Sequence, residues 1–502
     1  MFPPDNGQAS ATTAGDRFRW FSMYDYETKW PMDLWQRTII LRQRYDRENM
    51  SLSRRQFLFA SSAAAMQPIV RRLPNIVFIL LDDAGWGDFG CYGQKLIKTP
   101  HIDKVASEGT RFTDCYAGGV VCAPSRSVLM TGLHTGHTPV RANAGTYPIR
   151  ATDVTVAKVL QNAGYSTGGF GKWGLGDARS EGVPEKHGFD EFFGYLHQVH
   201  AHSYYPDFLW DNGKKFPLVG NKNGDGTQYS ADVIADKSLA FLETHTGKPF
   251  FLYACTTLPH AKFEPPDLAP YEKMPWTEGQ KAYAAMMTRA DAYVGRIMNA
   301  LRDHKLDNET VVFISSDNGA PKGGGEDKGF DLFRSNAHLR GEKGQLYEGG
   351  IRDPMIVRWP GRVKAGAVSD YPWYFADIMP TFAEIARTAP PKGIDGVSIL
   401  QLLLGGAAPK REFLYWEANA WNAKSQKLLP ERLGQAVRTG DWKAIRSKPG
   451  APLELYNLRK DPSEATDVAA ANPAVIARIE AYLKTARTEP RPHDVGIMDF
   501  VR

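Results

Sequence analysis

The chain has 502 residues, which at roughly 100 to 200 residues per domain allows two to four domains and a core large enough for an enzyme. Hydrophobic residues make up 42% of the chain and charged residues 23%, and these globular proportions exclude wholesale disorder, a collagen-like chain and a coiled coil. Because the net charge is only 61 − 56 = +5 and no apolar run approaches the roughly 20 residues of a membrane span, we expect neither a nucleic-acid partner nor stable insertion into a membrane.

The N-terminal region carries an export signal in our interpretation. Residues 51–70 (SLSRRQFLFASSAAAMQPIV) place paired arginines before an apolar stretch and small residues, an order that matches a bacterial twin-arginine signal. We assign residues 50–73 to this signal, and we expect the twin-arginine export machinery as a partner and a periplasmic or extracellular location. A basic helix start followed by an alanine-rich helix is the alternative. We expect Met50 to be the true start, which leaves residues 1–49 as an uncertain extension, and an authentic cytoplasmic extension is the alternative.

From Pro74 onwards, short apolar runs that end in polar clusters alternate with stretches of helical spacing, which is typical of an α/β fold. The runs NIVFILL, FFLYA and VVFIS predict buried strands at residues 75–81, 250–254 and 311–315. Apolar spacing predicts helices at residues 102–108, 154–161, 282–302 and 377–387. We therefore predict a large, mixed but mostly parallel sheet that is covered by helices on both faces.

Polar residues follow each of the three predicted strands. Asp82 and Asp83 end the first strand, His260 follows the second, and Asp317 and Asn318 end the third. Because ligands bind beyond the carboxyl ends of the strands in open α/β sheets, we expect these side chains to meet at one edge. The sequence therefore predicts a site built from three distant segments.

The remaining regions are less regular. Residues 182–229 are aromatic and glycine-rich without a strong period, and we interpret them as a long excursion near the site. Residues 322–337 predict a mobile loop. After about residue 407, FLYWEA, QAVRTGDWKAIR and LELYNL predict antiparallel strands, followed by a helix at 473–488. We therefore assign residues 408–502 to a small C-terminal α+β domain built on an antiparallel sheet.

The string Cys122-Ala123-Pro124-Ser125-Arg126 is the most specific feature of the sequence, and Thr-Gly follows at residues 131–132. Four cysteines are too few for a disulfide framework, and an isolated cysteine is usually a small buried hydrophobe. This string, however, resembles the signature of the formylglycine-dependent (type I) sulfatases of the alkaline phosphatase superfamily, and the resemblance runs from about residue 75 to about residue 458. It implies an alkaline phosphatase-like catalytic domain at residues 74–407. It also implies that a formylglycine-generating maturation enzyme oxidises Cys122, so that the formylglycine hydrate is the nucleophile.

Two acidic segments look like the metal-binding segments of the same family. They are Leu81-Asp82-Asp83 and Ser316-Asp317-Asn318-Gly319. Three carboxylates and an amide oxygen are hard ligands that suit Ca²⁺ or Mg²⁺, and the absence of clustered Cys and His ligands argues against a structural zinc site. We expect Ca²⁺, in preference to Mg²⁺, at a site formed by Asp82, Asp83, Cys122, Asp317 and Asn318.

Several cationic positions also resemble the family pattern. Lys172, in GKWGLG, resembles a lysine that contacts the sulfate group and would offer a point charge to an anionic oxygen. The family commonly has a histidine two positions later, where this chain has Gly174, so the hydrogen bond to the formylglycine hydrate lacks its usual carrier. His137 is a candidate substitute. His260 resembles the histidine that contacts the sulfate ester, and Lys343, in LRGEK, resembles the second active-site lysine.

The resemblance implies a sulfuric ester hydrolase, similar to the arylsulfatases, that releases inorganic sulfate. Arg126 would bridge the nucleophile and the nearby carboxylates, while either His260 or Lys343 would protonate the leaving oxygen. We expect a sulfated carbohydrate or another sulfated small molecule as the substrate, with aryl sulfates as artificial substrates. The alternatives are a phosphate or phosphonate ester hydrolase of the same superfamily and an exported, catalytically silent binder of sulfated glycans.

Two groups of aromatic residues have more than one interpretation. His197, His200 and His202 lack a carboxylate or cysteine that would complete a zinc site. They belong either to a substrate-facing loop or to a loop packed by its own rings. Trp416 and Trp421 either form a platform for a sugar or pack between domains.

Overall fold

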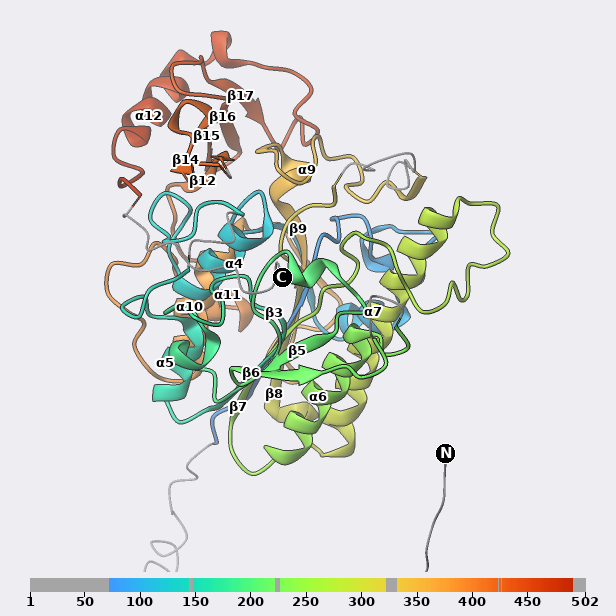
Figure 1. Cartoon of the computed structure of the whole chain (residues 1–502). Helices are drawn as coiled ribbons and strands as arrows, with labels where there is room; N and C mark the ends of the chain where they lie inside the picture. The colour runs from blue at the N-terminus through green and yellow to red at the C-terminus, as the bar shows by residue number, and fades with distance from the viewer. Residues whose placement is uncertain are drawn as a thin grey trace, which may run out of the picture. The chain divides into compact units, whose positions relative to one another are not determined.

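The computed structural model describes residues 72–143, 148–221, 226–321, 332–422, 424–425 and 427–490. The strands of the main sheet are β1 (Asn75–Leu81), β2 (Thr110–Tyr116), β3 (Ser166–Lys172), β4 (Glu191–Tyr195), β5 (Phe208–Asp211), β6 (Lys214–Pro217), β7 (Phe250–Cys255), β8 (Thr310–Ser316), β9 (Arg352–Arg358), β10 (Ala367–Ser369) and β11 (Trp373–Tyr374). Their order is β10-β2-β9-β8-β1-β7-β3-β4-β5-β6, with β11 paired to β2. Figure 1 labels β3 and the strands β5 to β9 of this sheet. The neighbours from β8 to β4 run parallel, whereas β9, β5 and β6 pair antiparallel. The polar residues at the carboxyl ends of β1, β3, β7 and β8 therefore lie close together, on the side of the sheet where these parallel strands end.

Strand β1 illustrates why helices cover both faces. All of its residues are buried, and successive side chains point to opposite faces of the sheet. Phe78 and Leu80 belong to one hydrophobic core, whereas Val77 and Ile79 belong to another. A strand buried on both faces reads as a continuous apolar run, which is what the sequence of β1 shows.

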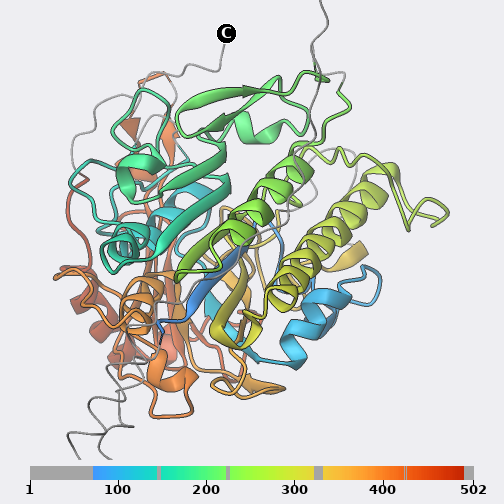
Figure 2. The same cartoon turned by 90° about the horizontal axis from the view of Figure 1, so that it is seen from below.

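The covering helices divide between these two cores. The first core contains side chains of α4 (Cys122–Thr131), α5 (Val156–Asn162), α10 (Ile378–Ile385) and α11 (Leu400–Leu403). The second contains side chains of α3 (Pro100–Ser107), α6 (Ser230–Thr244) and α7 (Glu278–Asp303). Figure 2 shows α6 and α7 lying side by side over their face of the sheet. The predicted α/β fold with helices on both faces is confirmed.

The individual elements follow the prediction closely. Strand β1 has the predicted bounds, and β7 and β8 extend the predicted strands by one residue at one or both ends. Helix α7 begins four residues before predicted residue 282. The reason is a capping box, in which Thr277 and Gln280 satisfy each other's backbone N–H groups at the start of the helix.

The interpretation of residues 182–229 as an excursion was wrong in part. Strand β4 pairs parallel with β3, and β5 and β6 continue the sheet as an antiparallel hairpin. These strands are only four or five residues long and contain glycine and aromatic residues, so their period was too short to recognise. A short helical turn, η3 (His200–His202), lies between β4 and β5.

The C-terminal region contains the predicted antiparallel sheet. Its order is β12-β15-β16-β17, and α12 (Pro473–Leu483) follows. The strands are β12 (Leu414–Ala418), β15 (Gly434–Thr439), β16 (Trp442–Arg446) and β17 (Glu454–Asn457), with a separate pair β13 (Trp421–Asn422) and β14 (Lys427–Leu428). The division into domains at residue 407 stays a prediction. The extension at residues 1–49, the predicted export signal up to residue 71 and most of the loop predicted at 322–337 lie outside the described residues.

Candidate functional site

The carboxyl ends of β1 and β8 place three acids side by side. Asp82 and Asp83 follow β1 directly, and the backbone N–H of Asp83 donates to Oδ1 of Asp317 at 3.3 Å. Asp83 has a φ of 69°, a left-handed conformation that non-glycine residues adopt at a cost and that is typical of functional sites. All three carboxylates are buried. Since adjacent strands impose this proximity, the sequence prediction of a site at this edge agrees with the structure.

Cys122 lies at the first position of α4 and is buried against the acids. Its Sγ is 3.4 Å from Oδ1 of Asp82, and Nζ of Lys343 lies 3.5 Å from the same sulfur. Burial, together with Asp317 and Asp82, raises the pKa of the Cys122 thiol to about 12. A thiol with so high a pKa is protonated at neutral pH and is a poor nucleophile in its unmodified form.

Lys172 and Arg126 neutralise the acids from a second side. Nζ of Lys172, at the end of β3, lies 2.6 Å from Oδ2 of Asp82. The Arg126 guanidinium reaches Oδ2 of Asp317 from two nitrogens, each at 2.8 Å, and Oδ2 of Asp82 at 3.8 Å. Burial alone would raise the pKa of Asp82, but Lys172 and the other cations outweigh burial and hold it well below its usual value. For Asp317, burial and the charge of Asp82 prevail over Arg126 and raise its pKa to about 6.

Lys343 and His260 lie next to Asp83 and contact each other. Nζ of Lys343 lies 2.6 Å from Oδ1 of Asp83 and 3.3 Å from Nε2 of His260. Nε2 of His260 is also 3.4 Å from Oδ2 of Asp83. The Tyr204 hydroxyl donates to the His260 carbonyl at 2.7 Å, which fixes the backbone that carries the imidazole. Burial lowers the pKa of His260, although Asp83 opposes the shift.

We call this group of side chains the rim cluster. It contains all of the predicted catalytic and metal-binding residues, from six separate segments of the chain: Asp82, Asp83, Cys122, Arg126, Lys172, His260, Asp317, Asn318 and Lys343.

The rim cluster offers carboxylate and amide oxygens of the kind that suits a hard divalent cation. Potential ligand atoms of Asp82, Asp83, Cys122 and His260 lie within 4.8 Å of one another. Asn318 donates its Nδ2 to Oδ1 of Asp83 at 2.7 Å, while its own Oδ1 is buried and has no hydrogen-bond partner among the described residues. A buried amide oxygen without a partner is costly unless a ligand satisfies it. Carboxylate oxygens beside such an atom match the donors that Ca²⁺ and Mg²⁺ prefer.

His202 lies close to the rim cluster, although the sequence placed it only in an aromatic loop. Its ring stacks on that of His260, with centroids 4.5 Å apart and an angle of 19° between the planes. Burial and the charges of His260 and Lys172 lower the pKa of His202 to about 4. The sequence signal was the third histidine in the run at 197–202, but nothing local indicated which of the three would reach the site.

Other candidate residues lie elsewhere. His137, the candidate substitute for the missing histidine, hydrogen-bonds Asp395 at 3.0 Å and stacks on His134, outside the rim cluster. Trp416 is fully buried and donates to the Ala117 carbonyl at 2.9 Å, so it packs in the core and cannot form an exposed sugar platform.

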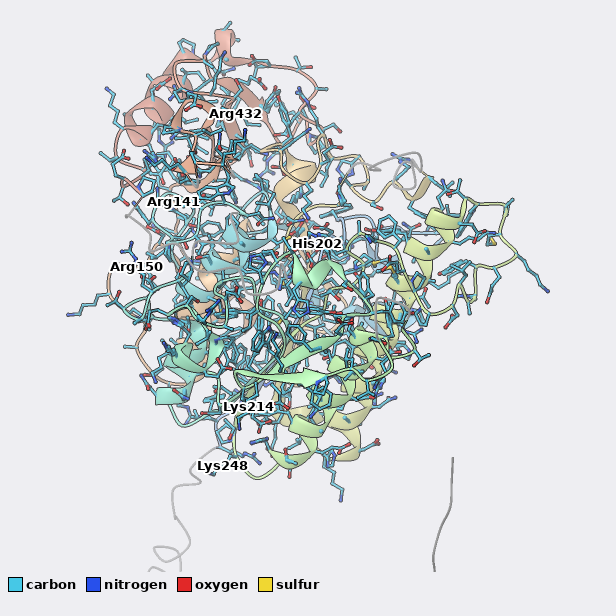
Figure 3. The ribbon with its side chains drawn as sticks, viewed as in Figure 1. Arg141, Arg150, His202, Lys214, Lys248 and Arg432 are labelled. Atoms are coloured by element: carbon cyan, nitrogen blue, oxygen red, sulfur yellow. The ribbon has the colours of Figure 1, made fainter. Side chains whose placement is uncertain are left out.

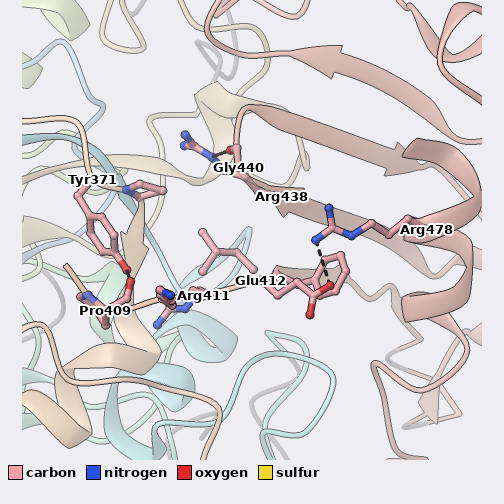
Figure 4. Close-up of a pocket in the computed structure, with 11 residues that line it drawn as sticks. Tyr371, Pro409, Arg411, Glu412, Arg438, Gly440 and Arg478 are labelled. Atoms are coloured by element: carbon pink, nitrogen blue, oxygen red, sulfur yellow. Dashed lines mark hydrogen bonds and ion pairs between the residues drawn. The ribbon is translucent and has the colours of Figure 1, made fainter. Parts of the chain in front are cut away.

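A separate cavity of about 620 Å³ is lined by eleven residues, which include Arg411, Glu412 and Arg478 (Figure 4). Three of its charged groups, Arg411, Glu412 and Arg478, are already paired. Arg478 lies 3.0 Å from Glu412, and Arg411 donates to the buried Asp377 at 2.8 Å. The cavity contains no residue of the rim cluster, so we assign it no part in the chemistry.

The described part of the chain contains no helix that combines the length and the apolar character needed to cross a membrane.

Comparisons with known proteins agree with the geometry. The family model described as Sulfatase matches residues 74–388, and a model described as N-sulphoglucosamine sulphohydrolase, C-terminal, matches residues 338–489. The chain is 32% identical over 427 residues to N-acetylgalactosamine-6-sulfatase of Canis lupus familiaris. This alignment covers 77% of the present chain and 75% of the relative. It is 31% identical over 466 residues to arylsulfatase A of Homo sapiens, in an alignment that covers 82% of the present chain and 87% of the relative. Among solved structures, Ps i-CgsB in complex with k-i-k-neocarrahexaose matches with a TM-score of 0.73 and 28% identity over 84% of this chain and 95% of that chain.

Proposed function

Because the chain belongs to the sulfatase family of the alkaline phosphatase superfamily and is a sulfuric ester hydrolase, we propose that it removes sulfate from a sulfated carbohydrate by means of the rim cluster. One observation carries this proposal. The thiol that would be converted to formylglycine lies 3.4 Å from one acid and 3.5 Å from one lysine of a buried group of acids and cations.

The nucleophile in this proposal is the hydrate of a formylglycine made from Cys122 by a maturation enzyme. Two features support the conversion. The unmodified thiol is held protonated, and Cys122 begins a helix, where backbone N–H groups favour oxygen atoms that carry negative charge. The hydrated aldehyde supplies a hydroxyl nucleophile, a function that the buried thiol performs poorly.

We infer that Asp82, Asp83, Asp317 and Asn318 hold a divalent cation together with residue 122. The partnerless Oδ1 of Asn318 supports this inference, since it lies in a buried group of carboxylates. Such a cation supplies Lewis-acid stabilisation of negative charge on oxygen. We favour Ca²⁺ because it tolerates a larger and less regular set of oxygen ligands than Mg²⁺ does.

The cations of the cluster prepare the site for an anionic ester. Lys172, Lys343 and Arg126 balance the three acids, so the protein charges sum to 3 − 3 = 0 when all six groups are ionised. A divalent cation raises this sum to +2, which favours a negatively charged sulfate ester in a site with little water. The three side chains also hold the acids in place before any substrate binds.

We propose that His260 or Lys343 protonates the leaving oxygen. The two nitrogens lie 3.3 Å apart, so either can reach the same atom. Lys343 carries the proton that a general acid needs, because its acidic neighbours raise its pKa despite burial. An imidazole ordinarily titrates near neutral pH and suits proton transfer there, but burial lowers the pKa of His260. A leaving-group series distinguishes the two residues.

The substrate class and the location complete the proposal. The relatives named above act, by their names, on N-acetylgalactosamine 6-sulfate and aryl sulfates, and the structural neighbour was solved with a carrahexaose. These names support a sulfated sugar as the substrate. We also propose export through the twin-arginine machinery to the periplasm or the exterior, on the basis of residues 50–73.

The test is a pair of aryl esters with the same leaving group, one a sulfate and one a phosphate. Enzyme produced together with a formylglycine-generating enzyme should hydrolyse the sulfate preferentially, and Cys122→Ala should lower kcat/KM by roughly 10⁴-fold or more. Cys115→Ala is the matched control, since Cys115 is equally buried but lies in β2, outside the rim cluster, and should keep activity within about threefold. A clear preference for the phosphate would overturn the proposal, and binding of sulfated glycans with no turnover would indicate a silent binder.

A further inference from the structure

The segment at residues 197–202 joins two parts of the site that are far apart in the sequence. Its start is held beside the end of β3, since the N–H groups of Trp173 and Gly174 donate to the carbonyls of Tyr195 and Leu196 at 2.9 and 3.0 Å. Its end is η3, which places His202 on His260. Figure 3 labels His202 on this short turn. The segment therefore runs along the edge that carries the rim cluster.

Gly174 makes room for this segment. Its φ is 76°, and a Cβ added to it would lie only 2.2 Å from Nε2 of Gln198. Gln198 is 5% exposed, and neither of its amide atoms has a hydrogen-bond partner among the described residues. A histidine at 174, the common residue of the family at this point, would collide with this amide. The amide of Gln198 fills the space where that side chain would begin.

His202 brings an imidazole to the same edge from the other end of the segment. Its ring lies parallel to that of His260 at 4.5 Å, and its side chain is half-buried. His260 is committed to Lys343, to Asp83 and to the carbonyl of Ala261. By contrast, neither ring nitrogen of His202 hydrogen-bonds to any residue in the part of the chain that the structure describes. An imidazole that is stacked in place and has both nitrogens free is prepared to bind a ligand.

We propose that His202 hydrogen-bonds a hydroxyl group on the alcohol part of the sulfate ester, beside His260, and that Gly174 and Gln198 position the segment that presents it. A neutral imidazole offers one donor and one acceptor, which match the hydroxyl groups of a sugar better than the acceptor-only oxygens of sulfate. His202 is also less buried than His260, which is only 7% exposed, so a substrate group that extends from the ester oxygen towards solvent would reach its ring. This inference rests on the proposed function and names the substrate class of the same site.

Two variants of His202, together with a control variant in the same segment, test the proposal. His202→Phe keeps the ring stacked on His260 but removes both nitrogens. His202→Gln keeps a donor and an acceptor but loses the stacking. Val199→Ser is the matched control, because Val199 lies in the same segment and is 55% exposed. Each mature enzyme is assayed with 4-nitrophenyl sulfate and with a panel of sulfated monosaccharides, and the monosaccharide with the highest wild-type turnover is used for comparison.

We expect His202→Phe to lower kcat/KM for the sulfated monosaccharide by about 10- to 100-fold, chiefly through KM, and to lower kcat/KM for the aryl sulfate several times less. His202→Gln should retain more activity on the sugar than His202→Phe does, and Val199→Ser should match the wild type. Gln198→Ala should remove the amide that packs against Gly174 and reproduce the selective loss on the sugar.

Three results would overturn the proposal. They are equal losses on both substrates, better retention by His202→Phe than by His202→Gln, and a wild type that hydrolyses aryl sulfate but no sulfated monosaccharide. In the first two results the wild type still hydrolyses the sulfated sugar, so the proposed function stands. The third result also contradicts the carbohydrate substrate of the proposed function, and a wild type that hydrolyses neither sulfate contradicts the sulfatase chemistry itself.

Discussion

The described chain contains two buried groups of charges that have the same composition and different surroundings. The rim cluster has three acids, which follow β1 and β8, and three permanent cations, which come from β3, α4 and the segment before α9 (Glu348–Ile351). A second group also has three acids and three cations, together with a tyrosine, and it connects the main sheet to the C-terminal sheet. We call it the junction cluster, and its members are Asp114, Tyr116, Glu348, Arg352, Arg438, Lys443 and Glu464.

The two clusters differ in how their polar atoms are satisfied. In the junction cluster, Lys443 lies 2.8 Å from Oε1 of Glu348, and the hydroxyl of Tyr116 donates to Oε2 at 2.7 Å. The cations outweigh burial and lower the pKa of Glu348 to about 2. Burial raises the pKa of one acid in each cluster, that of Asp317 in the rim cluster to about 6 and that of Glu464 in the junction cluster. Oε1 of Glu464 lies 2.9 Å from Nζ of Lys443, whereas Oδ1 of Asn318 in the rim cluster has no hydrogen-bond partner among the described residues. Buried charges therefore indicate chemistry only where polar groups remain that the protein itself does not satisfy.

The largest expected effect is a loss of activity when a buried lysine of the rim cluster is replaced. The same replacement of a buried lysine in the junction cluster should not cause this loss. Lys172→Met should lower kcat/KM for an aryl sulfate by roughly 10³- to 10⁴-fold, because it removes a positive charge that faces the developing negative charge. Lys443→Met, equally buried, should leave kcat/KM of the folded enzyme within about threefold but lower the free energy of unfolding by about 3 kcal/mol. Steady-state kinetics and denaturant unfolding measure both quantities. Equal losses of activity in the two variants would remove the distinction between the clusters.

Removal of the divalent cation should act on the rim cluster alone. Dialysis against a chelator should lower kcat by about a hundredfold or more, and Ca²⁺ should restore it. Bound Ca²⁺ at 100 times its Kd should also add about 2.7 kcal/mol to the free energy of unfolding, which thermal melts with and without the ion would detect. A fully active, metal-free preparation, verified by elemental analysis, would contradict the metal site.

A leaving-group series should identify the acid within the rim cluster. If His260 is the acid, His260→Ala should lower kcat/KM by about 10²-fold for a poor leaving group and much less for 4-nitrophenolate, which needs little protonation. Lys343→Ala should then lower both by similar factors, because it removes charge stabilisation. The reverse pattern would assign the acid to Lys343.

Changes in the junction cluster should have the smallest effect on activity. Their effect should instead be seen in how the free energy of unfolding depends on pH. Glu348 has a folded-state pKa of about 2, below the usual value of 4.5. Its contribution is therefore complete above about pH 4.5 and is lost as the pH falls towards 2, because the unfolded state then binds the extra proton. Glu348→Gln should lower the free energy of unfolding by about 3 kcal/mol at pH 7 and flatten its decline between pH 4.5 and pH 2. An unchanged acid-unfolding curve would contradict this role.

The sequence predicted the acids of the rim cluster well because their positions depend on local rules. Asp82 directly follows a continuous apolar run, and Asp317 follows the apolar run VVFI after two serines. Parallel neighbours in a sheet bring such strand ends together. The positions of Cys122, Lys172 and Lys343 came instead from the resemblance to a family. Periodicity alone gave no reason to associate them with the acids.

The parts that could not be predicted depend on contacts between distant segments. The stacking of His202 on His260 joins residues that are 58 positions apart, since 260 − 202 = 58, and no pattern in either segment indicates it. Strands β4 to β6 were missed because each is too short to show a period. The role of Glu348 was also missed, because its partner Lys443 lies in the C-terminal sheet.

Peptide mass spectrometry of the segment that contains Cys122 tests the central claim most directly. Enzyme produced with and without a formylglycine-generating enzyme should contain different fractions of the aldehyde at residue 122, and kcat per molecule for an aryl sulfate should rise in proportion to that fraction. Full activity in a preparation whose residue 122 is entirely unmodified thiol would contradict the account.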